Sequence, residues 1–176
     1  MRLVDCTYDR HAEPILAIFN EAIAHSTALY EYRLRTLENM TAWFDAKATG
    51  SFPVIGVESR EEEGGKLLGF ASYGPFRPYA AFKYAVEHSV YVHVDHRGRG
   101  IGSLLMKTLI EQATAQQMHL MIGGIDADNL GSIALHQRLG FSHSGTIRQA
   151  GFKFGRWLDL SFYQKVLDTP DNPVDG

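Results

Sequence analysis

The sequence contains almost no cysteine and no long hydrophobic run. Cys6 is the only cysteine among 176 residues, so neither an intrachain disulfide nor a cysteine-built metal site can form. No apolar run approaches the ~20 residues that span a membrane. The N-terminus also lacks the hydrophobic segment of a signal peptide. These absences predict a cytoplasmic protein with no metal and no membrane partner.

The chain also lacks an excess of positive charge. Its formal net charge is −3, from 17 Lys and Arg against 20 Asp and Glu. Because nucleic-acid binding needs clustered excess cations, this balance argues against nucleic acid as a partner. The length fits one domain, and we find no linker, repeat or low-complexity segment. We therefore expect one domain over residues 1–166, followed by a flexible C-terminal tail at 167–176.

The most informative stretch is residues 90–103, with the sequence VYVHVDHRGRGIGS. Its alternating valines favour a strand. The leucines that follow recur at helical spacing and predict a helix over Ser103–Gln116. Gly98, Gly100 and Gly102 therefore precede a helix N-terminus, where free N–H groups and the helix dipole attract anions. A ligand that carries phosphates is expected here.

Glycine spacing separates three phosphate-binding patterns. A P-loop needs Lys-Ser/Thr after its last glycine, and the dinucleotide fingerprint needs G-x-G-x-x-G; neither is present. The segment Arg97-x-x-Gly100-x-Gly102 instead resembles the R/Q-x-x-G-x-G/A element of the GCN5-related N-acetyltransferases (GNAT), which binds the pyrophosphate of acetyl-CoA. Taken alone, it is equally consistent with a glycine-rich turn that carries two solvated arginines.

Hydrophobic periodicity and turn residues predict the remaining elements. A helix over Ala12–His25 has Pro14 in its first turn, and a second helix follows Thr36 and ends near Gly50. A short helix begins at Ser132 and ends at a glycine cap. The expected strands are 2–6, 53–58, 66–73, a long strand from 86 into the valines of 90–94, 120–126, 144–147 and 157–166.

This order of elements is similar to that of the GNAT superfamily. A second segment, Asn129-x-x-Ser132-x-x-Leu135-x-x-x-Leu139-Gly140-Phe141, resembles its N-x-x-A/S-x-x-x-Y/H-x-x-x-G-F element. The resemblance implies a single-domain α/β (α+β) GNAT fold. Its central sheet would be mixed and mostly antiparallel, with about seven strands and about four flanking helices, and would be splayed at the cofactor site.

A closer resemblance covers nearly the whole chain. The segments Val86–Val92 and Lys153–Asp159 resemble the phosphinothricin and methionine sulfone/sulfoximine N-acetyltransferases. That branch uses acetyl-CoA to acetylate the α-amino group of small amino-acid analogues, and its members are typically homodimers. The resemblance thus implies an acetyl-CoA-dependent enzyme with a small amino-acid substrate and a second copy of the chain as partner.

The expected chemistry requires a general base, because an ammonium group cannot attack a thioester. Glu87 lies in the strand beside the glycine turn and matches the branch segment, so we predict it as the base; it could also be a solvated carboxylate on an exposed strand face. His88 is the neighbouring alternative, although strand alternation turns it to the opposite face. His136 occupies the position of the superfamily's tyrosine acid and is either that acid or a packing residue.

The resemblance also implies binding residues. Cofactor contacts are expected from Val90, Tyr91, Val92, Gly98, Arg99, Gly100, Ile101, Gly102, Ser103 and Asn129, with the Val92 N–H polarising the thioester carbonyl. Arg77 can bind an α-carboxylate with both arms of its guanidinium. The predicted substrate contacts are Tyr30, Arg77, Pro78, Tyr79, Glu87, His88 and Ser89, while Tyr73 and Phe76 could enclose the substrate stem. Lys153 and Arg156 either reach the far end of the substrate or support a dimer surface.

Two alternative functions stay open at this point. A GNAT enzyme could act on another amine, such as a protein N-terminus or a polyamine, although the segment Arg77–Lys83 is cationic and a polyamine site should be rich in carboxylates. A non-catalytic acyl-CoA-binding module is the other alternative. That module would not need a usable base, so Glu87 counts against it.

Overall fold

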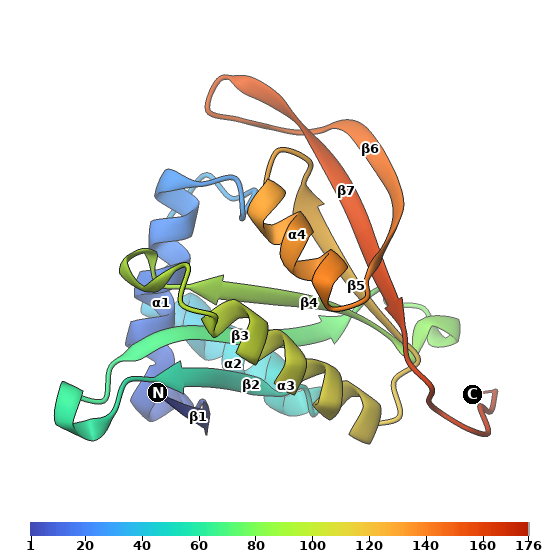
Figure 1. Cartoon of the computed structure of the whole chain (residues 1–176), viewed down its shortest axis with the longest axis horizontal. Coiled ribbons are helices and arrows are strands. Elements are labelled where there is room, and N and C mark those ends of the chain that lie inside the picture. The colour runs from blue at the N-terminus through green and yellow to red at the C-terminus, as the bar shows by residue number, and fades with distance from the viewer. Residues whose placement is uncertain (176) are drawn as a thin grey trace. The chain divides into compact units, whose positions relative to one another are not determined.

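The computed structural model describes residues 1–175 (Figure 1). Its four α-helices are α1 (Tyr8–His25), α2 (Leu37–Thr49), α3 (Ile101–Ala115) and α4 (Leu130–Arg138). The strands are β1 (Arg2–Asp5), β2 (Val54–Glu58), β3 (Leu67–Pro75), β4 (Ala85–Val92), β5 (Leu120–Asp126), β6 (Ser142–Lys153) and β7 (Arg156–Val166). They form a 7-stranded mixed sheet in the order β1-β2-β3-β4-β5-β7-β6. The expected numbers of strands and helices are confirmed.

Internal contacts divide the chain into two compact units, and each unit comprises two stretches of sequence. Unit 1 contains Met1–Ser72 and Ser89–Leu109, and unit 2 contains Tyr73–His88 and Ile110–Gly176. The divisions fall inside β3, β4 and α3, so these elements contribute to both units. β4 in particular passes from unit 2 into unit 1 after His88.

The core of unit 1 forms between α1, α2 and the strands β2 and β3. The apolar side chains along one face of α1 are buried, and Ile15 has no exposed surface. Phe19 on α1 packs its ring 4.9 Å from that of Phe70 and 5.2 Å from that of Tyr91. Burial of each large apolar side chain stabilises a fold by roughly 1.5–3 kcal/mol. This cluster therefore holds the final residues of β4 against α1.

Three of the predicted helix starts are wrong. α1 begins at Tyr8 rather than Ala12, because the His11 N–H bonds the Thr7 carbonyl at 2.9 Å and the Thr7 N–H bonds His11 Nδ1 at 2.9 Å. Pro14 consequently lies inside the helix and not in its first turn, where a missing N–H would cost least. α3 begins at Ile101 rather than Ser103, and α4 begins at Leu130 rather than Ser132.

Unit 2 contains β5, α4 and the long β6–β7 hairpin (Figure 1). β5 pairs in parallel with the start of β4 and antiparallel with β7. The prediction of a strand at 144–147 was too short, since β6 spans 12 residues with two irregularities in its register. The turn between β6 and β7 is Phe154-Gly155, and both residues have positive φ, at 52° and 74°. A two-residue hairpin of this kind needs positive φ at both turn positions.

The residues after β7 form hydrogen bonds with other residues of unit 2. The Leu167 N–H donates to the His119 carbonyl at 2.7 Å, and Leu167 itself is buried. Further along, the Val174 N–H donates to the Tyr84 hydroxyl at 3.2 Å. The last residue of the expected tail, 176, lies outside the described residues. The flexibility of this tail stays a prediction.

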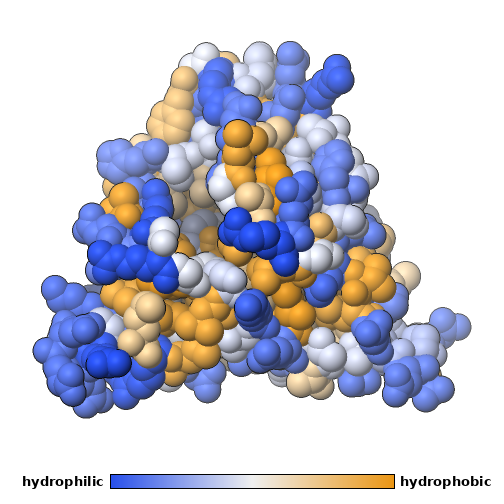
Figure 2. Space-filling model, in the orientation of Figure 1, coloured by the Kyte–Doolittle hydropathy of each residue, from blue (hydrophilic) through white to orange (hydrophobic). Residues whose placement is uncertain are grey.

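Hydrophilic residues are prominent on the viewed surface of unit 1. The turn between β2 and β3 carries Glu61, Glu62 and Glu63 and lies within the blue group at the lower left of Figure 2. In the part of the chain that the structure describes, no helix has the length and apolar character needed to cross a membrane.

Candidate active site

Glu87 lies in unit 2 at the point where β4 and β5 stop pairing. The parallel ladder joins Ala85–Glu87 to Leu120–Ile122, and among the described residues it ends there although both strands continue. This end of the ladder agrees with the expected splay. The Glu87 side chain is half-buried, and burial raises the pKa of its carboxyl group while the positive charge of Arg77 opposes that rise. A carboxylate with a raised pKa is suited to accept a proton.

Arg77 is an exposed cation in the segment that joins β3 to β4. Its guanidinium lies 4.3 Å from the centre of the Phe76 ring and donates to the Phe76 carbonyl at 3.0 Å. The two residues that follow, Pro78 and Tyr79, are exposed, and their contact with the substrate stays a prediction. Tyr73, by contrast, is fully buried and donates its hydroxyl to Gln116 at 2.8 Å, so it does not line a pocket.

His88 and His136 form a buried pair between β4 and α4. The Nε2 atoms of the two rings are 3.0 Å apart, and the rings stack with centroids 5.0 Å apart. His136 Nδ1 also lies 2.7 Å from the Ser132 carbonyl. The residues are 8% and 1% exposed, respectively. His88 faces α4, whereas the carboxylate of Glu87 lies against Gly124. The two side chains thus lie on opposite faces of β4, as alternation predicts.

The hydrogen bonds assign the tautomers of this pair. A carbonyl oxygen can only accept, so His136 Nδ1 carries the proton and its Nε2 presents a lone pair to His88 Nε2–H. Burial, together with the smaller effect of the His136 charge, lowers the pKa of His88 to about 3. Burial also lowers the pKa of His136, against the opposing bond to Ser132. Both rings are therefore neutral near pH 7, and in this arrangement His136 Nε2 has no proton to donate to a leaving group.

Asn129 caps α4 at the end of β5. Its Oδ1 accepts from the Ser132 N–H at 3.1 Å, so the capping bond uses the carbonyl oxygen of the side chain and not the Nδ2 amide group. Arg156 holds the same junction from β7. It pairs with Asp128 at 2.9 Å and with Asp126 at 3.5 Å. These pairs hold the loop between β5 and α4. The two roles considered for Arg156, at the far end of the substrate or on a dimer surface, stay predictions.

Lys153, the residue paired with Arg156 across the hairpin, is buried in unit 2. Only 4% of its surface is exposed, and its Nζ lies 5.0 Å from the centre of the Phe154 ring. Its backbone partner in the β6–β7 register is Arg156. The side chain of Lys153 is therefore covered by other residues of the same chain.

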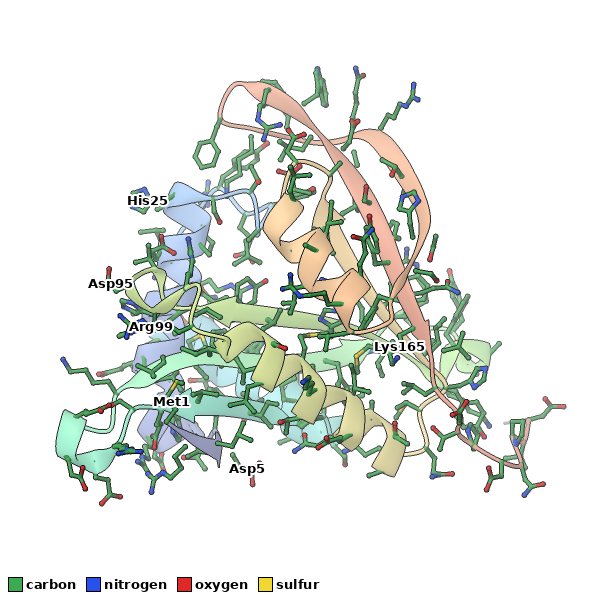
Figure 3. All side chains as sticks on the ribbon, in the orientation of Figure 1. Met1, Asp5, His25, Asp95, Arg99 and Lys165 are labelled. Carbon is green, nitrogen blue, oxygen red and sulfur yellow. The ribbon has the colours of Figure 1, made fainter. Side chains whose placement is uncertain are left out.

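The glycine turn of residues 98–103 lies in unit 1 after β4, and its last three residues form the start of α3. Gly98 and Gly100 have φ values of 75° and 79°, which favour glycine, and no described atom lies within 4 Å of where a Cβ would stand. The N–H groups of the first turn of α3 are directed out of the helix end. Arg99 in this turn is exposed and is labelled in Figure 3. The open backbone, the helix terminus and the cation together fit a pyrophosphate.

Other predicted residues of unit 1 have different surroundings. Arg97 of the motif is held by Glu21 at 2.9 Å and by the Val92 carbonyl at 3.3 Å. Ser89, Val90 and Val92 are partly exposed in β4, whereas the ring of Tyr91 packs in the core and leaves only its backbone for a cofactor. Ile101 is buried, with Gly102 and Ser103 beside it in the first turn of α3. Tyr30, in the loop after α1, is 37% exposed.

Comparison with known proteins decides the family. The model of the acetyltransferase (GNAT) family matches residues 16–141. The chain belongs to the GNAT family. It is 49% identical over 154 residues to the L-methionine sulfoximine/L-methionine sulfone acetyltransferase of Pseudomonas aeruginosa, covering 88% of each chain. It is 32% identical over 155 residues to the phosphinothricin N-acetyltransferase of Streptomyces coelicolor, covering 88% of this chain and 90% of that one.

A solved GNAT structure extends the comparison to three dimensions. The phosphinothricin acetyltransferase of Sinorhizobium meliloti, crystallised in complex with acetyl-CoA, superimposes with a TM-score of 0.89 at 32% identity. The superposition covers 94% of this chain and 88% of that one. The expected GNAT fold and N-acetyltransferase activity are confirmed by this family membership.

Two residues near Glu87 were missed by reasoning from the sequence. A methyl group at Gly123 would lie 2.7 Å from His88 Nε2, and one at Gly124 would lie 3.2 Å from Glu87 Oε1. A double glycine inside an apolar strand was the available signal, because glycine weakens a strand unless something approaches closely. Among the described residues, no cluster of three or more His, Cys, Asp or Glu side chains could hold a metal ion.

Proposed function

We propose that this GNAT enzyme transfers the acetyl group of acetyl-CoA to the α-amino group of a small amino-acid analogue of the methionine sulfone, methionine sulfoximine or phosphinothricin type. The observation that carries the proposal is Glu87, a half-buried carboxylate of raised pKa within the electrostatic influence of the exposed Arg77. The names of the relatives point to the same class of acceptor.

Glu87 would act as the general base of a direct transfer. It takes a proton from the substrate ammonium, either directly or through one water, and leaves a neutral amine. The amine nitrogen then bonds the acetyl carbon while the carbon–sulfur bond breaks and CoA leaves as its thiolate. The nitrogen loses its second proton to solvent, which leaves the neutral amide and can protonate the thiolate. Acetyl-CoA supplies the activated acyl group, and the chain needs no covalent enzyme intermediate. Cys6 is unsuited as a nucleophile, because burial raises the pKa of its thiol to about 12.

The remaining residues would bind the two substrates. Arg77 would hold the α-carboxylate, since its exposed guanidinium can donate two parallel hydrogen bonds. Pro78, Tyr79 and Tyr30 would line the acceptor, and Ser89 would contact it from β4. The glycine turn with Arg99 would hold the pyrophosphate, the Nδ2 group of Asn129 would reach the pantetheine arm, and the backbone of Val90–Val92 would orient the thioester.

A thiol-release assay with acetyl-CoA tests the proposal. The acceptors are methionine sulfone, methionine sulfoximine, phosphinothricin, spermidine and a short peptide. We expect the three amino-acid analogues to accelerate CoA release and the last two to have little effect. If no small amino acid accelerates release, the substrate assignment is wrong. In the same assay E87Q should lose about 10²–10⁴-fold in kcat near pH 7, the usual range for a general base.

We further propose that the enzyme is a homodimer. The β6–β7 hairpin exposes several large apolar side chains, among them Phe152, Phe154 and Trp157, and an exposed group of this kind commonly marks a protein interface. A second copy of the chain is the occupant implied by the resemblance. Light scattering coupled to size exclusion should give twice the mass of the chain, and W157E should shift it toward a monomer. A monomeric wild-type protein would contradict the proposal.

The proposed compartment is the cytoplasm. The acetyl donor is an intracellular metabolite, and the one cysteine is unpaired in the structure. Fractionation of cells that express the chain, with acetyltransferase activity as the readout, tests this assignment.

A further inference from the structure

Consecutive glycines in β5 face two functionally different side chains. A Cβ atom added at Gly123 would lie 2.7 Å from His88 Nε2 and 3.1 Å from His136 Nε2. A Cβ atom added at Gly124 would lie 3.2 Å from Glu87 Oε1. Successive residues of a strand point to opposite faces, so the two glycines open space on both sides of β5. One side accommodates the histidine pair and the other accommodates the carboxylate.

The histidine pair is connected to Glu87 through the backbone of β4. His88 follows Glu87 directly, and its ring is fixed by the Nε2–Nε2 bond of 3.0 Å and by the stack on His136. His136 is in turn fixed to its own helix by the 2.7 Å bond to Ser132. A strand residue held on one face determines the orientation of its neighbour on the other face. The parallel pairing with β5 ends at Glu87, so no further ladder bond to β5 supplies that restraint.

A second observation indicates that the pair is not arranged for stability alone. His88 Nδ1 is buried without a hydrogen-bond partner among the described residues. An unsatisfied buried acceptor destabilises the folded state, so an apolar ring at this position would be the more stable choice if packing were the only requirement. The hydrogen bond through Nε2 is what distinguishes histidine here.

We propose that His88, His136, Gly123 and Gly124 act together as positioning residues for Glu87. The hydrogen-bonded pair holds β4 against α4. The carboxylate of Glu87 then occupies the space left open by the missing side chain of Gly124. Neither histidine touches the reacting atoms in this assignment, and His136 does not protonate the leaving thiolate. The inference rests on the proposed role of Glu87 as the base.

The test is a double-mutant cycle with H88F, H136F and the double variant, which keep an aromatic ring but remove the hydrogen bond. Each single variant should lower kcat about tenfold or more, as small misplacements of reacting groups do. The double variant should be little worse than either single one, because both remove the same bond. H88Q, whose amide can present an N–H near the position of Nε2, should recover much of the loss.

The pH profile of kcat/KM separates positioning from a merely structural role. G124A adds a methyl group beside Glu87 Oε1, and its other near contacts are ordinary at 3.4 and 3.6 Å. It should move the acid-limb pKa of kcat/KM down toward that of an ordinary glutamate, because the carboxylate is displaced into solvent, with little change in thermal stability. G124A thus remains informative if the histidine variants fold poorly.

The matched control is H143F. His143 is an exposed histidine of unit 2 whose ring lies 5.3 Å from that of Tyr163, and it should retain the kcat and the pH profile of the parent. Multiplicative effects in the cycle together with an unchanged acid limb in G124A would overturn the proposal. So would loss of the alkaline limb in H136F alone, which would identify His136 as an acid. If E87Q is fully active and the parent has no acid limb, the assignment of Glu87 as the base fails instead, whereas the proposed transfer fails only if no amino acid accelerates CoA release.

Discussion

At the scale of single residues, Arg77 has two separable effects on the site. Its charge opposes the burial that raises the pKa of Glu87, so R77Q should raise that pKa and move the acid limb of kcat/KM to higher pH. R77Q should also raise KM for amino acids by about tenfold or more, because a charge-assisted bond to the α-carboxylate is lost. R77K keeps the charge without the bidentate geometry, so its acid limb should stay in place while KM still rises. If the acid limb does not move in R77Q, the predicted electrostatic effect of Arg77 on the pKa of Glu87 is wrong.

The residues of the site differ in how far the sequence could reveal them. Glu87 and Arg77 could be singled out in the sequence because their residue types and neighbours already suggest a base and a carboxylate ligand, roles that stay predictions. The bond between His88 and His136 was not, since it joins positions 48 residues apart and alternation gives a face but not the helix that covers it. The partners of Arg156 were hidden for the same reason, as Asp128 is 28 residues away.

At the scale of elements, Asn129 combines helix capping with the proposed contact to pantetheine. N129A should lower the free energy of unfolding by about 1 kcal/mol, the usual value of an N-cap, and should also raise KM for acetyl-CoA. N129D keeps a capping oxygen but has no Nδ2 group, so it should restore stability without restoring KM. Chemical denaturation and steady-state kinetics measure the two effects.

A cap in unit 1 provides the control for this prediction. Thr36 accepts from the Asn39 N–H at the start of α2, and T36A should cost a similar free energy while leaving KM for acetyl-CoA unchanged. If N129D recovers both stability and KM, Asn129 is only a cap.

The accuracy of the element boundaries follows the strength of local signals. α2 was placed within one residue because Thr36 and Gly50 mark both of its ends. The start of α1 was missed because its first turn, Tyr8–His11, carries polar residues and is stabilised through the His11 side chain. β6 was missed over most of its length because nearly all of it is exposed and two irregularities interrupt its alternation. Pairing with β7, and not its own pattern, makes it a strand.

At the scale of the whole molecule, element order was the most predictable property. It depends on which segments are strands or helices and tolerates errors of several residues at each boundary, as at α1 and β6. The parallel β4–β5 pairing was available only through the resemblance, because hydrophobic pattern does not give the direction of a neighbour. The same limit applies to the buried titratable groups, whose effect on stability becomes visible only once their partners are known.

The lowered pKa values of His88 and His136 predict that the folded enzyme loses stability in mild acid. Because the pKa of His88 falls to about 3 on folding and that of His136 is also lowered, the unfolded chain binds more protons below about pH 6.5. Stability should therefore fall as the pH drops from 7 to 5, by on the order of 1–2 kcal/mol. Glu87, whose pKa is raised, acts in the opposite direction at lower pH.

The lowered pKa of Glu58 adds a separate loss of folding stability at lower pH. Burial raises the pKa of this carboxyl, but hydrogen bonds from Arg2 and His11 and the charge of Arg10 outweigh burial, so stability is lost below about pH 4.5. Urea unfolding between about pH 5 and pH 8 isolates the histidine contribution, because the carboxyl of Glu58 remains ionised throughout that range. The H88F/H136F variant should show a flatter dependence of unfolding free energy on pH. An equally steep dependence in that variant would place the acid sensitivity elsewhere in the chain.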